Sequence, residues 1–282
     1  MTDSAKQSSA SLTETLSLLQ SLGHAPKKHL GQNFLVDKNI LQKSMQLAEV
    51  RAGDIVVEVG PGLGTLSNVL LERGAAVWAV EKDATLASFL QKRFADSSNF
   101  HLTLGDALDF PTAQVPAKVF KIVANVPYAI SSPWIDAVLS GSTLPERMVL
   151  LLQKENADRL TAAHDTKNFG ALPIFLQSAY DVLKGHKVSP SCFFPKPKVD
   201  SYLLNLRKKD APFIFSTSAK ALIRSLFLYR RKQLFSILKS LSREPLMEVF
   251  LAHSIAPTAR PESIPLSVWQ GVSTYLQKGN AN

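Results

Sequence analysis

The segment Val119-Phe-Lys-Ile-Val-Ala-Asn-Val-Pro-Tyr128 carries the clearest structural signal in the chain. Its apolar part, residues 119–124, is typical of a strand that is buried on both faces of a parallel sheet. The run stops at Asn125, and Pro127 fixes the backbone before the aromatic Tyr128. Because ligands of open α/β sheets bind outside the carboxyl ends of the strands, we expect Asn125 and Tyr128 to lie at a binding site.

These end-of-strand residues favour a particular chemistry. The side-chain carbonyl of Asn125 and the main-chain carbonyls of Val126 and Pro127 would suit the NH₂ group of a planar base. Hydrogen bonds to these oxygens would keep the nitrogen near a tetrahedral shape, with its lone pair aimed at an electrophile. Tyr128 offers a flat face on which such a base can stack. The alternative is an ordinary strand-to-loop turn with a buried tyrosine.

Three earlier strands are predicted at residues 54–59, 76–80 and 101–104, and each ends on a notable residue. The first runs into Gly60-Pro-Gly-Leu-Gly64, where the dinucleotide fingerprint would need its third glycine at the position of Thr65. The second and third end at Glu81 and Asp106, which could accept ribose hydroxyls and the amine of an adenine. Each acid alone could be a helix N-cap or a solvated loop residue. Together they describe a cleft for an adenosine whose tail is not a pyrophosphate.

The alternation of strands and helices continues to about residue 210 and then stops. Further strands are predicted at 147–153, 181–188 and 201–207, and after Pro212 only helices are predicted, at 218–229, 232–241, 246–253 and 266–277. We therefore expect an α/β domain over residues 27–210 and a helical domain over 211–282. Residues 1–26 form an N-terminal extension with a short helix, in which Leu12, Leu16, Leu19 and Leu22 share one face.

The charge of the chain is concentrated in one region. Residues 184–243 hold 14 lysines and arginines against two acids, a balance of +12 in a chain of net charge +9. The remainder is therefore close to neutral, and a polyanion docking on one region is favoured over a basic face kept for solubility. Within this region, residues 191–199 interleave Lys196 and Lys198 with aromatic residues, a pattern that suits an unstacked base. The alternative for that segment is a hairpin loop with a hydrophobic plug.

Composition excludes several other classes of protein. Cys192 is the single cysteine, so no internal disulfide can form, and we expect a packing role for it in a reducing cytoplasm. No apolar run approaches the roughly 20 residues that a membrane helix needs. The serine-rich start, Met1 to Ala10, lacks the apolar core of a signal peptide. The six histidines are scattered, so no metal site is predicted.

Taken together, these segments resemble the KsgA family of ribosomal RNA adenine dimethyltransferases from about Lys27 to Gln277. The motifs that carry the resemblance are Leu30-Gly-Gln-Asn-Phe-Leu35, Glu58-Val-Gly-Pro-Gly-Leu-Gly64, Glu81-Lys82, Gly105-Asp106, Asn125-Val-Pro-Tyr128, Phe193-Phe-Pro-Lys-Pro-Lys-Val-Asp-Ser201 and Arg230-Arg-Lys232. The resemblance implies a Rossmann-like class I methyltransferase domain with a seven-stranded mixed sheet and a small C-terminal helical domain. It implies S-adenosylmethionine as the methyl donor, without a metal.

The resemblance also implies a substrate and a partner. The substrate would be two adjacent adenosines in the loop of the 3′-terminal hairpin of 16S rRNA, each methylated twice on its exocyclic amine. The partner would be the small (30S) ribosomal subunit or its precursor, and the enzyme would act as a cytoplasmic monomer with a role in subunit biogenesis.

Roles for individual residues follow from the resemblance position by position. The donor would be held by Asn33, Leu35, Gly60, Glu81, Asp106 and Asn125. The target amine would be held by Asn125 and Pro127, and its base would stack between Tyr128 and Phe193, with Phe194 as the fallback for the second face. RNA would be bound by Lys196, Lys198, Arg224, Arg230, Arg231 and Lys232. Val126, Ala129 and Ala171 depart from the usual Leu, Asn and Arg, and none of the three is assigned to the donor.

Three alternatives stay open at this point. One is an antibiotic-resistance rRNA methylase that modifies a large-subunit adenine, against which the match across the C-terminal region argues. Another is an RNA-binding or ribosome-assembly factor that has lost catalysis, which the intact Asn125, Tyr128, Glu81 and Asp106 disfavour. The third is a nicotinamide dehydrogenase, which Thr65 disfavours.

Overall fold

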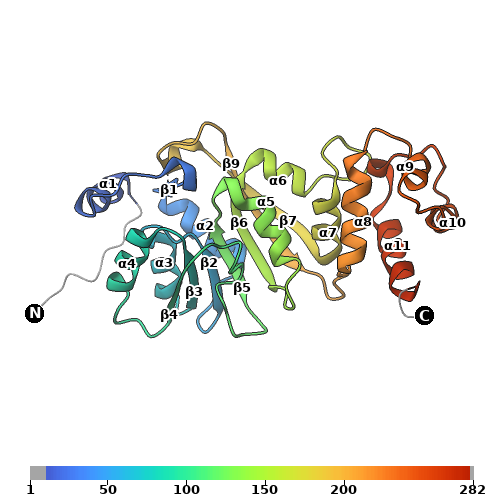
Figure 1. The fold of residues 1–282 in the computed structure, drawn as a ribbon. Coiled ribbons are helices and arrows are strands. Elements are labelled where there is room, and N and C mark those ends of the chain that lie inside the picture. The colour runs from blue at the N-terminus through green and yellow to red at the C-terminus, as the bar shows by residue number, and fades with distance from the viewer. Residues whose placement is uncertain (1–10, 280–282) are drawn as a thin grey trace, which may run out of the picture. The chain divides into compact units, whose positions relative to one another are not determined.

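The protein contains a seven-stranded mixed sheet, seen in a computed structural model that describes residues 11–279 (Figure 1). The strand order is β4-β3-β2-β5-β6-β9-β7, as expected for a Rossmann-like sheet. The expectation about Met1 to Ala10 lies outside the described residues. The strands are β2 (Ile55–Val59), β3 (Ala76–Glu81), β4 (Phe100–Leu104), β5 (Lys121–Asn125), β6 (Arg147–Gln153), β7 (Tyr180–Val188) and β9 (Ser201–Lys208).

The strand order reverses between β2 and β5, which lie side by side in the sheet. From β2 the chain adds β3 and then β4 on one side, and it returns to place β5 and β6 on the other side. These neighbouring pairs are parallel, whereas β9 is antiparallel to β6. A reversal of this kind opens a crevice between the carboxyl ends of the two central strands. The residues that follow β2 and β5 therefore meet at one place.

Helices α2 (Lys38–Ala48) and α3 (Thr65–Glu72) pack on one face of the sheet. The Asp37 carboxylate caps α2 by accepting hydrogen bonds from the N–H groups of Asn39 and Ile40. The apolar side chains of α2 and α3 meet Val56, Val77 and Val123 in one hydrophobic core. Helix α4 (Ala84–Arg93), which the sequence analysis does not predict, follows β3, and α5 (Ser131–Val138) follows β5.

A two-stranded sheet joins two motifs that are far apart in the sequence. Strand β1 (Phe34–Leu35) pairs antiparallel with β8 (Phe193–Phe194), with Phe34 opposite Phe194 and Leu35 opposite Phe193. Neither strand is predicted from the sequence. Because two-residue strands have no periodicity to read, only the tertiary structure reveals this pairing.

Helix α1 (Leu12–Ser21) forms within the N-terminal extension, as predicted, but it buries a different face. Leu12 and Leu16 are 47% and 43% exposed, whereas Thr15 and Leu19 are buried. Leu19 packs with Phe34 in a small hydrophobic cluster, and Leu18 and Leu22 add to it. Of the leucines predicted to share one face, Leu19 and Leu22 therefore pack in this cluster, whereas Leu12 and Leu16 stay exposed.

Within residues 11–279 the chain falls into two compact units, residues 11–154 with 182–208 and residues 155–181 with 209–279. The second unit is helical, and the sequence expectation of a domain over residues 211–282 omits its first segment. That segment contains most of α6 and the apolar α7, and α7 packs against α8 and α11. The helices are α6 (Lys154–Leu160), α7 (Ala171–Ala179), α8 (Thr217–Leu228), α9 (Leu234–Ser240), α10 (Pro245–Ala252) and α11 (Leu266–Gly279).

The core of the helical unit is aromatic. Trp269 of α11 is fully buried, and its ring meets the rings of Phe250 and Phe227 at 5.7 and 5.9 Å between centroids. Phe175 of α7 meets Phe215 at 5.3 Å. Such pairs stabilise a small core beyond the area they bury. No helix of the described residues is both long and apolar enough to cross a membrane.

Candidate active site

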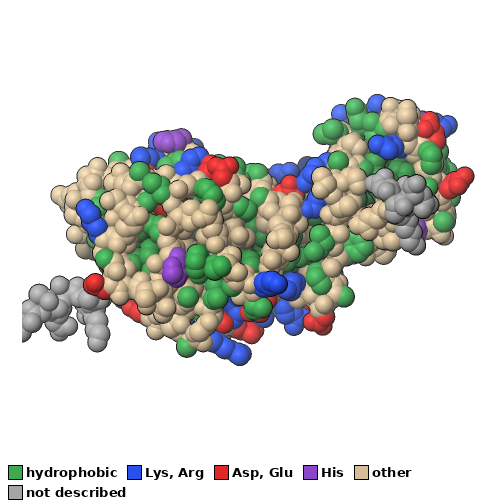
Figure 2. Space-filling model, turned by 60° about the horizontal axis from the view of Figure 1, so that its bottom comes forward, with side chains coloured by type: hydrophobic (Ala, Val, Ile, Leu, Met, Phe, Trp, Pro, Cys, Tyr) green, Lys and Arg blue, Asp and Glu red, His purple; other side chains and the backbone are tan. Residues whose placement is uncertain are grey.

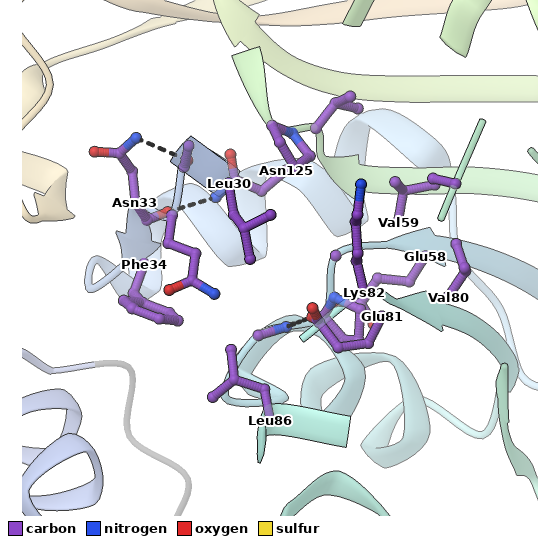
Figure 3. A pocket seen from close by; sticks show the side chains of 18 of the residues that line it. Leu30, Asn33, Phe34, Glu58, Val59, Val80, Glu81, Lys82, Leu86 and Asn125 are labelled. Atoms are coloured by element: carbon purple, nitrogen blue, oxygen red, sulfur yellow. Dashed lines mark hydrogen bonds between the residues drawn. The ribbon is translucent and has the colours of Figure 1, made fainter. Parts of the chain in front are cut away.

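A cavity lies at the carboxyl ends of β2, β3, β4 and β5, where the reversal of strand order predicts one (Figure 3). Its walls come from the turn after β2, the residues that end β3 and β5, and the loop 29–35 that precedes α2. The cavity collects most of the residues that the sequence assigned to the donor and the target base. These are Asn33, Leu35, Gly60, Glu81, Asp106, Asn125, Pro127 and Tyr128.

The glycine-rich turn brings the main chain close to this cavity. Gly60, Gly62 and Gly64 have φ angles of +65°, +60° and +75°, a region that side-chain-bearing residues rarely adopt. A Cβ on Gly64 would lie 2.7 Å from Leu90 Cδ2, so the glycine also allows α3 and α4 to pack closely. The Gly62 N–H points to Glu81 and donates a hydrogen bond of 3.0 Å to Oε2.

Glu81 ends β3 and is 6% exposed. Its second oxygen, Oε1, accepts a hydrogen bond of 2.8 Å from the Asp83 N–H. Burial raises the pKa of Glu81, while the N–H groups of Asp83 and Gly62 act in the opposite direction. Each carboxylate oxygen has a further lone pair, so the group can still accept two hydroxyls.

Glu58 is a second buried carboxyl in the cavity wall, and the sequence analysis gave it no role of its own. It is 2% exposed, and the Ser67 hydroxyl donates a hydrogen bond of 2.6 Å to Oε2. Burial raises the pKa of Glu58 to about 8, Ser67 opposes the shift, and the charge of Glu81 adds to it. The signal for this residue was a lone acid in the apolar strand Ile55–Val59.

Asp106 follows β4, and its carboxylate is ionised. Lys82 Nζ lies 2.6 Å from Oδ2, and Oδ1 accepts a hydrogen bond of 2.9 Å from the Leu108 N–H. The Leu108 N–H and Lys82 together hold the pKa of Asp106 below its usual value. An anionic acceptor at this position suits an exocyclic amine, which has hydrogens to donate.

Asn125 is held by the loop that precedes β1. Its Nδ2 donates a hydrogen bond of 2.9 Å to the main-chain carbonyl of Asn33, and the Asn33 side chain donates one of 3.1 Å to the Gly31 carbonyl (Figure 3). Because the nitrogen of the Asn125 amide is used in this way, Oδ1 is the atom placed to accept a hydrogen bond from an amine.

Pro127 and Tyr128 continue the wall from Asn125. A Cβ built on Gly60 would lie 3.6 Å from Pro127 Cδ, so the turn after β2 and the residues after β5 approach one another closely. Tyr128 is half-buried, and its hydroxyl lies 2.7 Å from the Ser201 hydroxyl oxygen. Burial raises the pKa of Tyr128 although this hydrogen bond opposes the shift, so the phenol is neutral near pH 7.

The structure does not support the expected stacking role of Phe193. This side chain is 1% exposed and packs with Leu35 and Leu203 in the main hydrophobic core, so its ring has no face open to a base. Phe194 is half-buried against the cluster of Leu19 and Phe34. Pairing of β8 with β1 explains the difference, because it turns successive side chains to opposite sides. Neither phenylalanine lines the cavity.

The basic residues assigned to RNA differ in how far they are engaged within the protein. Arg230 donates hydrogen bonds of 2.7 Å to Glu262 Oε2 through both Nε and Nη2. This ion pair holds the segment that follows α8 and engages the guanidinium within the protein. Arg231 and Lys232 are exposed, as are Lys196 and Lys198. Arg224 is exposed, and its guanidinium lies 5.4 Å from the centre of the Phe175 ring.

On the face drawn in Figure 2, lysine and arginine side chains are interspersed with acidic ones rather than gathered in one field. Cys192 is buried in the core, as expected for a packing residue, and burial raises the pKa of its thiol. Among residues 11–279, no three histidine, cysteine or acidic side chains gather as a metal site would require.

Strand order, the position of the cavity and its acidic wall together define a class I, Rossmann-like methyltransferase, the class whose methyl donor is S-adenosylmethionine. The sequence model of the family described as "Ribosomal RNA adenine dimethylase" matches residues 23–278. The chain belongs to that family.

Curated relatives match over nearly their whole length. A protein of Opitutus terrae named "Ribosomal RNA small subunit methyltransferase A" is 54% identical over 272 residues, which is 92% of this chain and 96% of the relative. A protein of Clostridium botulinum with the same name is 37% identical over 88% of this chain and 93% of the relative.

Solved structures agree on the fold. The crystal structure of a dimethyladenosine transferase from Plasmodium falciparum has a TM-score of 0.74 at 27% identity, covering 87% of this chain and 98% of that one. The structure of the 23S rRNA methyltransferase ErmE has a TM-score of 0.63 at 24% identity, covering 86% of this chain and 99% of that one. At that identity the second likeness concerns the fold alone.

Proposed function

We propose that this enzyme dimethylates the exocyclic amines of two adjacent adenosines in the loop of the 3′-terminal hairpin of 16S rRNA. The observation that carries the proposal is the hydrogen bond of 2.9 Å from Asn125 Nδ2 to the Asn33 carbonyl, which leaves Oδ1 as the atom that can accept from an amine. The small-subunit name of relatives at 54% and 37% identity supports this substrate over a large-subunit adenine.

The residues of the cavity fit an adenosine-containing donor. We assign Glu81 to the ribose hydroxyls and Asp106 to the adenine amine, because these two carboxylates end adjacent strands. Gly60 lets the main chain approach the donor, and Asn33, Leu35 and Asn125 line the side from which the methyl group is offered. S-adenosylmethionine supplies a methyl group on a positively charged sulfur, which needs no further activation.

For the target base, Asn125 Oδ1 and the Pro127 carbonyl accept hydrogen bonds from the amine and orient its lone pair. The Pro127 carbonyl already accepts a hydrogen bond of 3.1 Å from the Ile130 N–H, which fixes its direction. Tyr128 provides one stacking face, and the hydrogen bond to Ser201 holds its ring in place. Phe193 would need to leave the core to provide the second face, so we assign only Tyr128 to stacking.

Positioning supplies most of the rate in this mechanism. The amine needs no strong base before it attacks, because its N–H becomes acidic only as the new bond forms. The leaving sulfide is neutral, so the site needs no group to stabilise a departing anion. Four transfers complete two adenosines, and the pocket must therefore admit an amine that already carries one methyl group.

The RNA is proposed to contact Lys196, Lys198, Arg224, Arg231 and Lys232. Exposed cations of this kind bind phosphates and give affinity without sequence specificity. Arg230 is left out of this set because Glu262 holds it. We further propose that the protein acts as a monomer, in the cytoplasm, on a small subunit or its precursor.

Mass spectrometry of rRNA provides the test. Small subunits from cells that lack the enzyme, naked 16S rRNA and large subunits are each incubated with the purified protein and S-adenosylmethionine. We expect two dimethylated adenosines in the 3′-terminal fragment of 16S rRNA and none in 23S rRNA. Methylation of a 23S adenine, or no methylation of any of the three substrates, would contradict the proposal.

A further inference from the structure

Asp83 lies two residues after Glu81, and its side chain is entirely buried. Its two oxygens have different partners. Oδ1 caps α4 by accepting hydrogen bonds of 2.9 and 3.2 Å from the N–H groups of Thr85 and Leu86. Oδ2 faces the N-terminal segment. A carboxylate that only had to cap a helix would need no second set of partners.

All the side-chain partners of Oδ2 come from residues 24–32. Lys27 Nζ lies 2.7 Å away, Gln32 Nε2 lies 3.3 Å away and His24 Nε2 lies 3.8 Å away. Burial works to raise the pKa of Asp83, but the hydrogen bonds from Lys27 and the Leu86 N–H outweigh it and leave the pKa below its usual value. The buried carboxylate is therefore charged, and it depends on this segment for its compensation.

Residues 24–32 are also held together by hydrogen bonds to the side chain of Gln32. Gln32 Oε1 accepts a hydrogen bond of 2.8 Å from the Lys27 N–H and lies 3.1 Å from His24 Nε2. Residues 24–32 thus form a closed loop that Asp83 fastens at one point. The chain then continues directly into Asn33, Phe34 and Leu35, which line the donor cavity.

The contacts of Asp83 with residues 24–32 are linked directly to Glu81, the carboxyl group proposed to bind the donor. The Asp83 N–H donates the hydrogen bond of 2.8 Å that orients Glu81 Oε1, so one residue holds both the N-terminal loop and the carboxylate proposed to bind ribose. The Asn33 carbonyl, which follows the loop, holds Asn125 on the opposite wall. Both walls of the cavity are therefore positioned through residues that the Asp83 contacts keep in place.

We infer that Asp83 is a positioning residue that fastens residues 24–33 over the donor cavity and thereby completes the S-adenosylmethionine site. The inference rests on the proposed assignment of the donor to this cavity. It gives a role to the C-terminal part of the N-terminal extension: α1 and residues 24–26 anchor the wall of the site. Leu19 adds to the anchor by packing with Leu63 and Leu86, which also line the cavity.

Three variants of the full-length protein test this inference. Asp83→Asn keeps an oxygen to cap α4 but presents an amide, without charge, to Lys27. Lys27→Met removes the cation from the other side of the contact, and because the Lys27 side chain is 41% exposed, the change removes no core packing. Asp37→Asn is the matched control, because Asp37 caps α2 in the same way and has no contact with residues 24–32 among the bonds described.

The measurements are binding of S-adenosylhomocysteine by calorimetry, kcat and KM for the donor, and trypsin cleavage in the segment 27–28. We expect Asp83→Asn and Lys27→Met each to weaken binding about tenfold, as loss of a charge-assisted hydrogen bond does. The double variant should be no weaker than the worse single one, because both changes break the same contact. At saturating donor kcat should stay within about twofold for both variants. Trypsin should cut faster in Asp83→Asn, which keeps both Lys27 and Lys28. Asp37→Asn should match the unaltered protein in all three.

The inference is overturned if Asp83→Asn and Lys27→Met bind S-adenosylhomocysteine as tightly as the unaltered protein. It is also overturned if their effects add, or if Asp37→Asn weakens binding equally, because Asp83 would then act only as a cap. If the unaltered protein itself did not bind S-adenosylhomocysteine, the assignment of the donor to this cavity would fail together with the inference, and that result is distinct from the others.

Discussion

At the residue scale, the site contains carboxyl groups whose surroundings set them in different protonation states. The pKa of Glu58 is raised to about 8 by burial, whereas the Leu108 N–H and Lys82 lower the pKa of Asp106. A neutral Glu58 limits the buried negative charge in the wall that it shares with Glu81, whose pKa is also raised by burial. Asp106 and Glu81 are therefore the carboxyl groups that can accept hydrogen bonds from the bound methyl donor.

Glu58 predicts a pH dependence of stability. Its pKa is about 8 in the folded state against 4.5 for an unperturbed carboxyl, so between these values the folded protein binds more protons than the unfolded one. The free energy of unfolding must then fall as the pH rises through this window. Glu58→Gln cannot ionise, and it should equal the unaltered protein near pH 5 and exceed it by about 2–4 kcal/mol near pH 8.

Urea denaturation of both proteins across this pH range measures the difference. Ser67→Ala serves as a second variant: removing the hydroxyl that lowers the pKa of Glu58 should extend the fall in stability to higher pH. Parallel stability curves for the unaltered protein and Glu58→Gln would show that Glu58 is ionised in the folded state.

At the element scale, the sequence predicted the strands of the large sheet well, because apolar runs bounded by glycine and polar residues mark its central strands β2, β5 and β6. Strand β6 occupies the predicted residues 147–153, and the others differ by one or two residues at their ends. Pairing of β1 with β8, by contrast, depends on contacts between segments far apart in the chain. No local pattern encodes such contacts, and for this reason the burial of Phe193 could not be foreseen.

The close contact between the glycine-rich turn and α4 gives a prediction about packing. Gly64→Ala would combine a φ of +75° with a Cβ 2.7 Å from Leu90 Cδ2 and 2.8 Å from Phe94 Cε2. Strain and overlap together should lower the free energy of unfolding by about 2–4 kcal/mol. Gly53→Ala is the control, since its φ is +85° and nothing lies within 4 Å of its Cβ.

For Gly53→Ala only the backbone strain remains, and we expect a loss of about 1–2 kcal/mol. Chemical denaturation of the two variants compares these values directly. Equal losses would mean that Leu90 and Phe94 move aside at no cost, and that the turn is not packed as tightly as the structure places it.

At the scale of the whole molecule, composition predicted an excess of basic charge but could not say which cations are available. Arg230 belongs to the Arg-Arg-Lys motif, yet Glu262, 32 residues further along, holds it. Likewise, residues 155–181 read as part of the α/β domain, although α7 packs with the C-terminal helices. The order of predicted elements along the sequence indicated a helical domain. Only the three-dimensional contacts show that residues 155–181 belong to it.

The exposed cations Arg231 and Lys232 predict how the enzyme binds a ribosomal particle. Arg231→Glu with Lys232→Glu should weaken binding of small subunits. The slope of log affinity against log salt should become shallower by the amount that about two phosphate contacts contribute. Binding of S-adenosylhomocysteine should not change. Lys92→Glu with Lys118→Glu makes the same change in net charge at exposed positions of the α/β unit.

Filter binding at several salt concentrations measures the slope for both double variants. The control pair should retain the slope of the unaltered protein. If both pairs weakened binding equally, net charge rather than these two side chains would attract the RNA.

The cavity at the end of β5 is the centre of this account, and single-turnover methylation of small subunits by Asn125→Ala tests it most directly. Loss of Oδ1 should slow methyl transfer by at least about 100-fold at saturating donor, because the amine is no longer oriented. S-adenosylhomocysteine should still bind, though less tightly. Asn68→Ala, which removes only a hydrogen bond to Glu72 within α3, should behave as the unaltered protein. Near-normal transfer by Asn125→Ala would contradict the placement of the reaction in this cavity.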